Sequence, residues 1–284
     1  MASARPMVNR LRRTARRSRG LTRWWILRRL ARDPRPPFVV FTMGKVASTT
    51  VYRSLTPVAA PVLKVHSVRS ERLAVMEESY RRTDPKALPR HLLHGWHLMD
   101  RPPTPDAPWT VITLVRDPIQ RSVSYFFHSG SRMGRLDTEA TAGRLARFVE
   151  REGIPRTLDW FERELEPVLG IDVLTHPFDP AIGHATVETP AARLLVLRQE
   201  SLDVAPAALG RFLGLDHDVV LDAYNVGAAK PYAAAYADAT EQLRFDDHVL
   251  DLAYESAWAK HFYSPAERQA LRARWGRSAS EPVA

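Results

Sequence analysis

Short apolar runs of β-branched and aromatic residues recur along the chain, separated by longer stretches of helical periodicity. Such runs are typical of parallel strands that are buried on both faces. They predict strands near residues 38–42, 62–66, 90–94, 110–115, 171–174 and 193–197. The remaining periodicity predicts a helix over 51–55, a helix-rich insertion over 119–168 and further helices over 206–275. The alternation predicts an α/β fold, a three-layer architecture with a central, mainly parallel sheet, helices on both faces and a helical C-terminal part.

Consecutive prolines mark the expected start of the folded domain. Residues 33–37 read Asp-Pro-Arg-Pro-Pro, a segment that ends any helix because proline fixes φ and lacks an amide donor. We therefore expect an N-terminal arm over residues 1–37, one α/β domain over 38–277 and a short tail over 278–284. The chain has 284 residues, of which 45% are hydrophobic, enough for a sizeable core.

The net charge of +9 comes from the arm alone. Residues 1–32 contain eleven Arg and no acidic residue, and subtracting these from the 41 basic residues leaves 30 against 32 acidic ones. The arm also carries aromatic and aliphatic residues, among them Trp24, Trp25 and Leu30. This composition indicates either peripheral contact with an anionic membrane surface or a solvated basic tail, and nucleic acid is the weaker third alternative. We expect no nucleic-acid partner.

The sequence shows neither an apolar stretch of the roughly 20 residues that span a bilayer nor a secretory signal. The expected location is therefore the cytoplasm, with contact at the inner face of the membrane as an option that the arm provides. The chain has no cysteine, which excludes disulfides, thiolate metal sites and cysteine nucleophiles. Its ten histidines show no close metal-ligand spacing, so we expect no metal.

A candidate anion-binding loop follows the first predicted strand. The sequence Met-Gly-Lys-Val-Ala-Ser-Thr-Thr over residues 43–50 joins that strand to a helix. Gly44 lets the backbone approach an anion, and the first amides of the helix are unpaired donors at the positive end of its dipole. Lys45 adds a cation, and Ser48 adds a hydroxyl group with its two threonine neighbours. The loop departs from the common nucleoside-triphosphate loop because Val46 follows the lysine.

A second candidate segment follows the strand predicted at 110–115. It reads Arg116-Asp117-Pro118, and proline is favourable in the first turn of a helix that Asp117 can cap. Arg121 and Ser124 follow at helical spacing. Arg116 and Ser124 are therefore placed to reach one phosphate group together.

These two segments resemble the two cofactor motifs of sulfotransferases. In that family the first loop holds the 5′-phosphosulfate of 3′-phosphoadenosine 5′-phosphosulfate, and the Arg and Ser of the second motif hold its 3′-phosphate. The resemblance implies a P-loop-like fold. It also implies a set of cofactor-binding residues, which comprises Gly44, Lys45, Val46, Ala47, Ser48, Thr49, Thr50, Arg116 and Ser124.

More narrowly, the chain resembles the bacterial group of capsular polysaccharide synthesis proteins. The similar stretches include residues 158–165, 195–202 and 261–264, together with Lys230, and the resemblance spans 38–275. Lys230 is a candidate for contact with the cofactor phosphates, and a solvated position is the alternative. The resemblance implies that the acceptor is a carbohydrate, in a capsular or other surface polysaccharide or a glycolipid.

The chemistry needs a base for the acceptor hydroxyl and a cation for the leaving group. Lys45 suits the leaving group. His94 is the first candidate for the base because its His-Gly pair, at the expected end of the strand over 90–94, resembles a motif of uronyl sulfotransferases. His97 is the near alternative, and His66 is the third.

We therefore expect a sulfotransferase that uses 3′-phosphoadenosine 5′-phosphosulfate to sulfate a carbohydrate hydroxyl. Two alternatives belong to other classes. A P-loop-like kinase would need a Walker loop and an acidic Mg²⁺ ligand, and the sequence has neither. A non-catalytic membrane-associated adaptor would depend on the arm over residues 1–32.

Overall fold

The structure is a computed structural model that describes residues 37–59, 61–83, 88–132, 141–222 and 232–277. Most of the predicted arm, the predicted tail and Lys230 lie outside these ranges. The predictions for the arm and for Lys230 therefore stay predictions.

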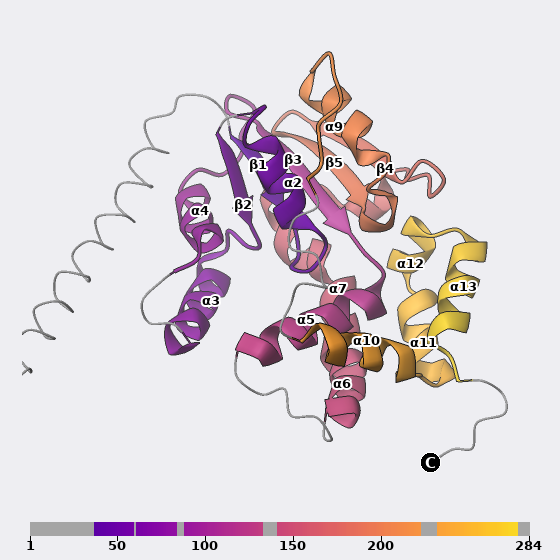
Figure 1. The fold of residues 1–284 in the computed structure, drawn as a ribbon. Helices are drawn as coiled ribbons and strands as arrows, with labels where there is room; N and C mark the ends of the chain where they lie inside the picture. The colour runs from indigo at the N-terminus through magenta and orange to yellow at the C-terminus, as the bar shows by residue number, and fades with distance from the viewer. Residues whose placement is uncertain (1–36, 60, 84–87, 133–140, 223–231, 278–284) are drawn as a thin grey trace, which may run out of the picture.

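A five-stranded sheet forms the centre of the molecule (Figure 1). Its order is β2-β1-β3-β5-β4, and the four strands β2, β1, β3 and β5 run parallel while β4 is antiparallel to β5. The strands are β1 (Phe38–Phe41), β2 (Val62–Val65), β3 (Trp109–Val115), β4 (His184–Thr189) and β5 (Ala192–Arg198). The predicted mainly parallel sheet is confirmed.

Both faces of the central strands are covered by helices and their connections. Consecutive residues of β1 and β3, such as Val39 and Val40, are fully buried although their side chains point to opposite faces. On one of these faces Phe41 meets the edge of Trp160, with ring centroids 5.6 Å apart. The continuous apolar runs of the sequence therefore have the physical origin that was expected, which is burial on both sides.

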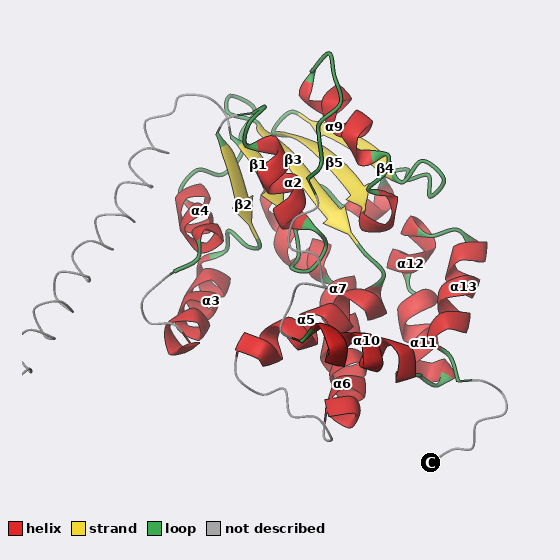
Figure 2. Ribbon diagram, viewed as in Figure 1, coloured by secondary structure: helices red, strands yellow, loops and turns green. Residues whose placement is uncertain are grey.

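Helices surround the sheet and make up the C-terminal part (Figure 2). They are α2 (Ser48–Leu55), α3 (Ser70–Thr83), α4 (Arg90–Met99), α5 (Pro118–Arg132), α6 (Thr141–Phe148), α7 (Ile154–Leu158), α8 (Glu166–Leu169), α9 (Ala205–Leu213), α10 (Ala233–Gln242), α11 (Asp247–Tyr254), α12 (Ala257–Phe262) and α13 (Pro265–Trp275). Figure 1 shows α3 and α4 beside the β2 edge of the sheet and α11 to α13 as a separate group. The predicted helix-rich insertion and the helical C-terminal part are confirmed.

Two predicted strands are wrong. Residues 90–94 form the first half of helix α4, because Leu92, Leu93 and Leu98 bury one side of a helix that begins after Pro89. Residues 171–174 form a loop and the start of a short 3₁₀ turn, Val173–Thr175, which the Asp172 carboxylate caps through the Leu174 amide at 3.0 Å. Asx capping of this kind competes with strand formation.

One strand was not predicted. In β4 only Val187 is buried, because this strand lies at the edge of the sheet and pairs with β5 alone. An edge strand with one buried residue gives little apolar signal in the sequence.

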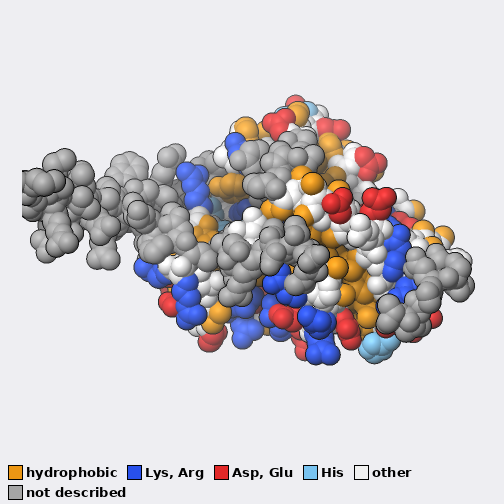
Figure 3. Space-filling model, turned by 60° about the horizontal axis from the view of Figure 1, so that its bottom comes forward, with side chains coloured by type: hydrophobic (Ala, Val, Ile, Leu, Met, Phe, Trp, Pro, Cys, Tyr) orange, Lys and Arg blue, Asp and Glu red, His pale blue; other side chains and the backbone are white. Residues whose placement is uncertain are grey.

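Basic and acidic side chains are interspersed on the face shown in Figure 3. This distribution agrees with the near balance of charge in the sequence after residue 32. No helix within the described ranges has the length and apolar character needed to cross a membrane.

Candidate anion-binding site

The loop between β1 and α2 turns sharply at the carboxyl end of the central strand. Lys45 and Ala47 adopt left-handed backbone conformations, with φ of 74° and 62°. Such conformations are uncommon for residues with a side chain and are often found at functional sites. The Ala47 carbonyl accepts hydrogen bonds from the amides of Thr50 at 3.0 Å and Val51 at 3.4 Å, which starts α2 at Ser48. The amides before them are at the N-terminal end of a helix, where an anion is favoured.

Two arginines from the second predicted segment hold this loop. The Arg116 guanidinium donates to the carbonyl of Lys45 at 3.0 Å, and the Arg121 Nε donates to the carbonyl of Gly44 at 3.2 Å. Arg121 is buried, its guanidinium lies 4.9 Å from the centre of the Tyr125 ring, and burial lowers its pKa to about 10. Arg121 is therefore cationic at neutral pH. The two segments, 71 residues apart between Lys45 and Arg116, meet at one place.

A buried carboxylate fixes the turn that carries Arg116. Asp117 accepts hydrogen bonds from the Gln120 amide at 2.5 Å and from the Tyr254 hydroxyl at 2.7 Å. Its own amide donates to Glu200 at 2.8 Å, and the Tyr263 hydroxyl donates to the other oxygen of Glu200 at 3.2 Å. The capping role predicted for Asp117 is confirmed. Burial raises the pKa of Asp117 to about 6.

The support for this turn comes from residues whose role the sequence did not reveal. Glu200 and Tyr263 belong to stretches quoted above for their resemblance to the capsular group, and here they pack behind the Arg116-Asp117 turn. Arg121 was noted for its helical spacing, but the bond of its guanidinium to the loop was not expected. The signal in the sequence is the spacing of Arg121 and Tyr125, four residues apart, which places a guanidinium and an aromatic ring on one face of the helix.

Ser124 lies on α5 one turn after Gln120 and is half-buried. Its contact with a phosphate stays a prediction, as does that of the hydroxyl groups of Ser48, Thr49 and Thr50. The Thr49 hydroxyl accepts a hydrogen bond from the Lys64 ammonium at 2.9 Å, so it lies beside a second cation.

His66 follows directly after β2, next to the loop. Its Nδ1 lies 2.6 Å from the carbonyl of Thr42, the residue between β1 and the loop. A carbonyl can only accept, so Nδ1 carries the proton and Nε2 keeps its lone pair. Burial, followed by the charge of Lys64, lowers the pKa of His66 to about 4, so the ring is neutral at pH 7.

His94 has the opposite arrangement. It lies inside α4 and is buried, and its Nδ1 accepts a hydrogen bond from the backbone amide of Lys64 at 3.0 Å. The Lys64 carbonyl is farther from the same nitrogen, at 3.3 Å. The amide can only donate and its contact is the shorter one, which favours the neutral tautomer with its proton on Nε2. Burial lowers the pKa of His94 to about 4.

His97 also lies on α4 and is buried, and its Nδ1 lies 3.3 Å from an Arg101 guanidinium nitrogen one turn further along the helix. Burial, followed by the charge of Arg101, lowers the pKa of His97 to about 4. Among the described residues, no group of three or more His, Asp or Glu is arranged to hold a metal ion.

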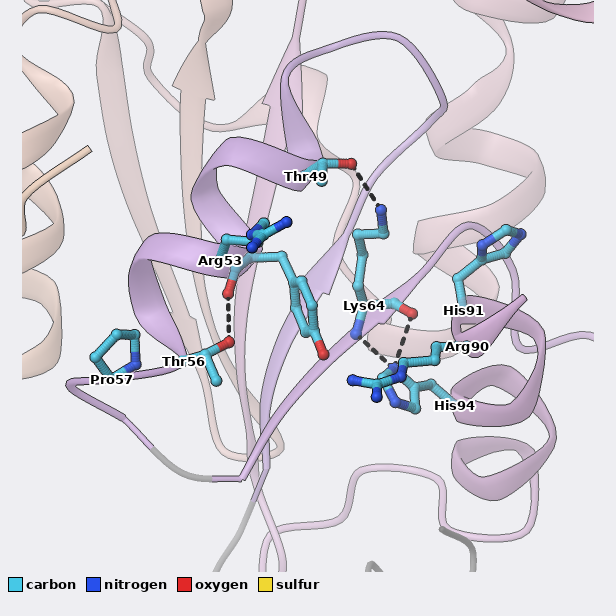
Figure 4. A pocket seen from close by; sticks show the side chains of 9 residues that line it. Thr49, Arg53, Thr56, Pro57, Lys64, Arg90, His91 and His94 are labelled. Atoms are coloured by element: carbon cyan, nitrogen blue, oxygen red, sulfur yellow. Dashed lines mark hydrogen bonds between the residues drawn. The ribbon is translucent and has the colours of Figure 1, made fainter. Parts of the chain in front are cut away.

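A basic cavity of about 560 Å³ opens beside the loop, between α2, β2 and α4 (Figure 4). Thr49 and Arg53 from α2, Lys64 from β2 and Arg90 and His94 from α4 line its wall. Figure 4 shows these side chains around one space, with the Lys64 ammonium turned toward Thr49. The sequence analysis did not identify this cavity.

Comparison with known proteins gives two similarities. A family model described as "Putative capsular polysaccharide synthesis protein" matches residues 135–264, somewhat under half of the chain, and confirms the resemblance to that group. The crystal structure of a sulfotransferase from Alicyclobacillus acidocaldarius aligns with 84% of this chain and 100% of its own, with a TM-score of 0.36 and 14% sequence identity. Among curated proteins, none matches the sequence significantly.

Proposed function

We propose that this protein is a sulfotransferase that transfers a sulfuryl group from 3′-phosphoadenosine 5′-phosphosulfate to a hydroxyl group of a carbohydrate. The observation that carries the proposal is the hydrogen bond from Arg116 to the carbonyl of Lys45. It joins the anion loop at the start of α2 to the segment that carries Arg116. A nucleotide with phosphate groups at both ends requires two such sites close together. The match of residues 135–264 to a capsular polysaccharide synthesis family supports a carbohydrate as acceptor.

The residues present fit this co-substrate. Lys45 and the hydroxyl groups of Ser48, Thr49 and Thr50 offer donors at the start of α2 for the 5′-phosphosulfate. Arg116 keeps further N–H groups besides the one bonded to the loop, and with Ser124 it would hold the 3′-phosphate. The co-substrate, when bound, supplies the sulfuryl group that is transferred.

Three side chains of this protein would perform the remaining work. Lys45 places a positive charge beside the oxygen that departs with the nucleotide. Arg121 holds the carbonyl of Gly44 and so keeps the loop in position. His66 removes the proton of the acceptor hydroxyl through Nε2. Its Nδ1 donates to the carbonyl of Thr42, so Nε2 is the unprotonated nitrogen.

The geometry therefore favours His66 over His94 as the base. The sequence ranked His94 first because of its His-Gly pair and because residues 90–94 were expected to form a strand. In the helix that they form instead, the Nδ1 of His94 is bonded to a backbone amide, and this bond favours the tautomer with the proton on Nε2. An imidazole in that tautomer has no free lone pair for an acceptor hydroxyl.

The test is transfer of labelled sulfate from the co-substrate to a panel of capsular polysaccharides and lipid-linked sugars, with the full chain. We expect transfer to at least one acceptor, and loss of more than about 100-fold in the variants Lys45→Met and Arg116→Met. The matched variants Lys260→Met and Arg193→Gln, whose side chains are paired with Glu255 and Glu188 far from the loop, should keep full activity.

Nucleotide binding separates this proposal from its rivals. Adenosine 3′,5′-bisphosphate should raise the melting temperature more than ATP with Mg²⁺ does. A larger shift with ATP and Mg²⁺ would favour a kinase. An adaptor would lose its function when residues 1–32 are deleted, whereas a sulfotransferase should still transfer sulfate in solution.

A further inference from the structure

The cavity between α2, β2 and α4 adjoins the expected nucleotide site and shares Thr49 with it, but it lies on the other side of β1. In the order β2-β1-β3, the anion loop follows the central strand β1, and Arg116 follows β3 on one side of it. The cavity lies on the other side, at β2. A nucleotide held by the loop and Arg116 would extend from the loop toward β3, which leaves the β2 side of the cavity for another ligand.

The lining of the cavity is strongly basic. Arg53, Lys64 and Arg90 come from three different elements and line the same space, and no Asp or Glu is among the described residues that line it. The Lys64 ammonium is held by the hydroxyl of Thr49 at 2.9 Å, and burial lowers its pKa. After burial, the charges of Arg90 and Lys64 also lower the pKa of His94, in keeping with their place around one space. Lys64 is half-buried and the two arginines are exposed, and cations that gather around one space favour an anionic ligand.

The cavity also reaches the reacting groups of the proposed function. Thr49 lines it from the first turn of α2, which belongs to the anion loop. His91 lines it from α4, and the ring of His91 lies 4.9 Å from that of His66. The part of a ligand that extends beyond the cavity on this side would therefore lie between the anion loop and His66.

The size and the remaining lining of the cavity suit a sugar ring. A volume of about 560 Å³ is within the range of small-ligand sites. Tyr52 adds an aromatic face to the wall, 5.9 Å from the Lys64 ammonium. Arginine binds a carboxylate through two parallel hydrogen bonds.

We infer that this cavity binds the carboxylate of a uronic acid residue in the acceptor, so that the preferred substrate is an acidic polysaccharide. The inference rests on the proposed function for the identity of the acceptor. Its contacts are those of Arg53, Lys64 and Arg90 with the carboxylate and of Tyr52 with the sugar ring.

The test is calorimetric titration of the full chain, saturated with adenosine 3′,5′-bisphosphate, with a tetrasaccharide of alternating glucuronate and N-acetylglucosamine. The control ligand is the same tetrasaccharide with its carboxylates reduced to alcohols. The variants are Lys64→Met and Arg90→Gln, and their matched controls are Lys260→Met and Arg193→Gln. Affinity for adenosine 3′,5′-bisphosphate is measured for each protein.

We expect the acidic tetrasaccharide to bind at least about tenfold more tightly than the reduced one, and each cavity variant to remove about tenfold in affinity for the acidic form alone. The control variants and the affinity for the nucleotide should stay within about twofold. Equal affinity for the two tetrasaccharides would overturn the inference. An equal loss of nucleotide affinity in Lys64→Met would also overturn it and assign the cavity to the nucleotide. Binding of the acidic sugar without any sulfate transfer would refute the proposed function and leave the anionic site standing.

Discussion

At the scale of single residues, the hydrogen bonds of two histidines decide which of them can accept a proton. His66 donates through Nδ1 to the carbonyl of Thr42, whereas the Nδ1 of His94 accepts from the amide of Lys64. The sequence could predict a histidine near the end of a strand, but not its tautomer. The tautomer depends on partners that are 24 and 30 residues away in the chain.

The variant His66→Asn tests the role of the base. We expect kcat for sulfate transfer to fall by about 10²–10⁴-fold while KM for the nucleotide changes little, because proton removal fails and the anion loop stays intact. Steady-state kinetics with labelled co-substrate measure both constants. The control His248→Asn, at an exposed position on α11, should be fully active. Activity of His66→Asn close to that of the unaltered protein would exclude this histidine as the base.

The variant His94→Ala tests a structural role for the residue that the sequence ranked first. Its loss leaves the amide of Lys64 without its acceptor, and we expect the free energy of unfolding to fall by about 1–3 kcal/mol. Urea unfolding followed by circular dichroism measures this change. The residual kcat of the folded variant should exceed that of His66→Asn at least tenfold. The reverse order of the two kcat values would contradict the assignment.

At the scale of elements, the sequence predicted best the strands that are buried on both faces. β1, β3 and β5 lie where continuous apolar runs placed them, as does the start of α5 at Pro118, and the edge strand β2 was also predicted although its burial alternates. The errors occurred where a short apolar run is compatible with both a strand and a helix. Leu92 and Leu93 suit a strand as well as the buried side of a helix, and tertiary packing selected the helix. The edge strand β4 has too few buried residues to be recognised.

The anion loop offers a test of its backbone conformation. Ala47 has a φ of 62°, which glycine adopts without the steric strain that a Cβ brings. We expect Ala47→Gly to leave stability unchanged or raise it by up to about 1 kcal/mol, and Ala47→Val to lower it by at least about 1 kcal/mol. Chemical denaturation measures both.

The matched control for this pair is Ala237→Gly, at an exposed position inside α10. The same substitution should there lower stability by about 1 kcal/mol, because glycine weakens a regular helix. A loss of similar size in Ala47→Gly would show that the left-handed turn is not under strain.

At the scale of the whole molecule, the sequence indicated that two distant segments meet, and the Arg116 bond to the loop agrees with this. It could not indicate the basic cavity, because Arg53, Lys64 and Arg90 share no motif and are brought together by the packing of α4 against β2. Contacts of this kind depend on the position of a helix that the sequence did not predict.

Two buried histidines and one half-buried histidine make the whole fold sensitive to acid. His66, His94 and His97 have pKa values lowered from 6.5 to about 4, so between these values the unfolded chain binds protons that the folded chain does not. Their stabilising contribution is complete above pH 6.5 and is lost as the pH falls toward 4. Asp117 acts in the opposite direction, since its pKa is raised from 3.8 to about 6. Three histidines outweigh one aspartate.

We therefore expect the free energy of unfolding to fall by on the order of 3 kcal/mol between pH 6.5 and pH 4.5. Urea unfolding at half-unit pH intervals measures the slope, and the values at pH 7.5 and pH 8.5 should agree with each other. A stability that is flat or rises on acidification across this window would contradict the burial of the three rings.

The hydrogen bond from the backbone amide of Lys64 to His94 affects whether copies of this protein can associate through the edge of the sheet. β2 is the last strand on its side of the sheet, and an uncovered last strand offers its peptide groups to any other extended chain. Here α4 packs along it and an imidazole occupies one of its outward amides. The sheet is thereby closed to growth by strand addition at this end, which favours solubility at high concentration over assembly into fibres.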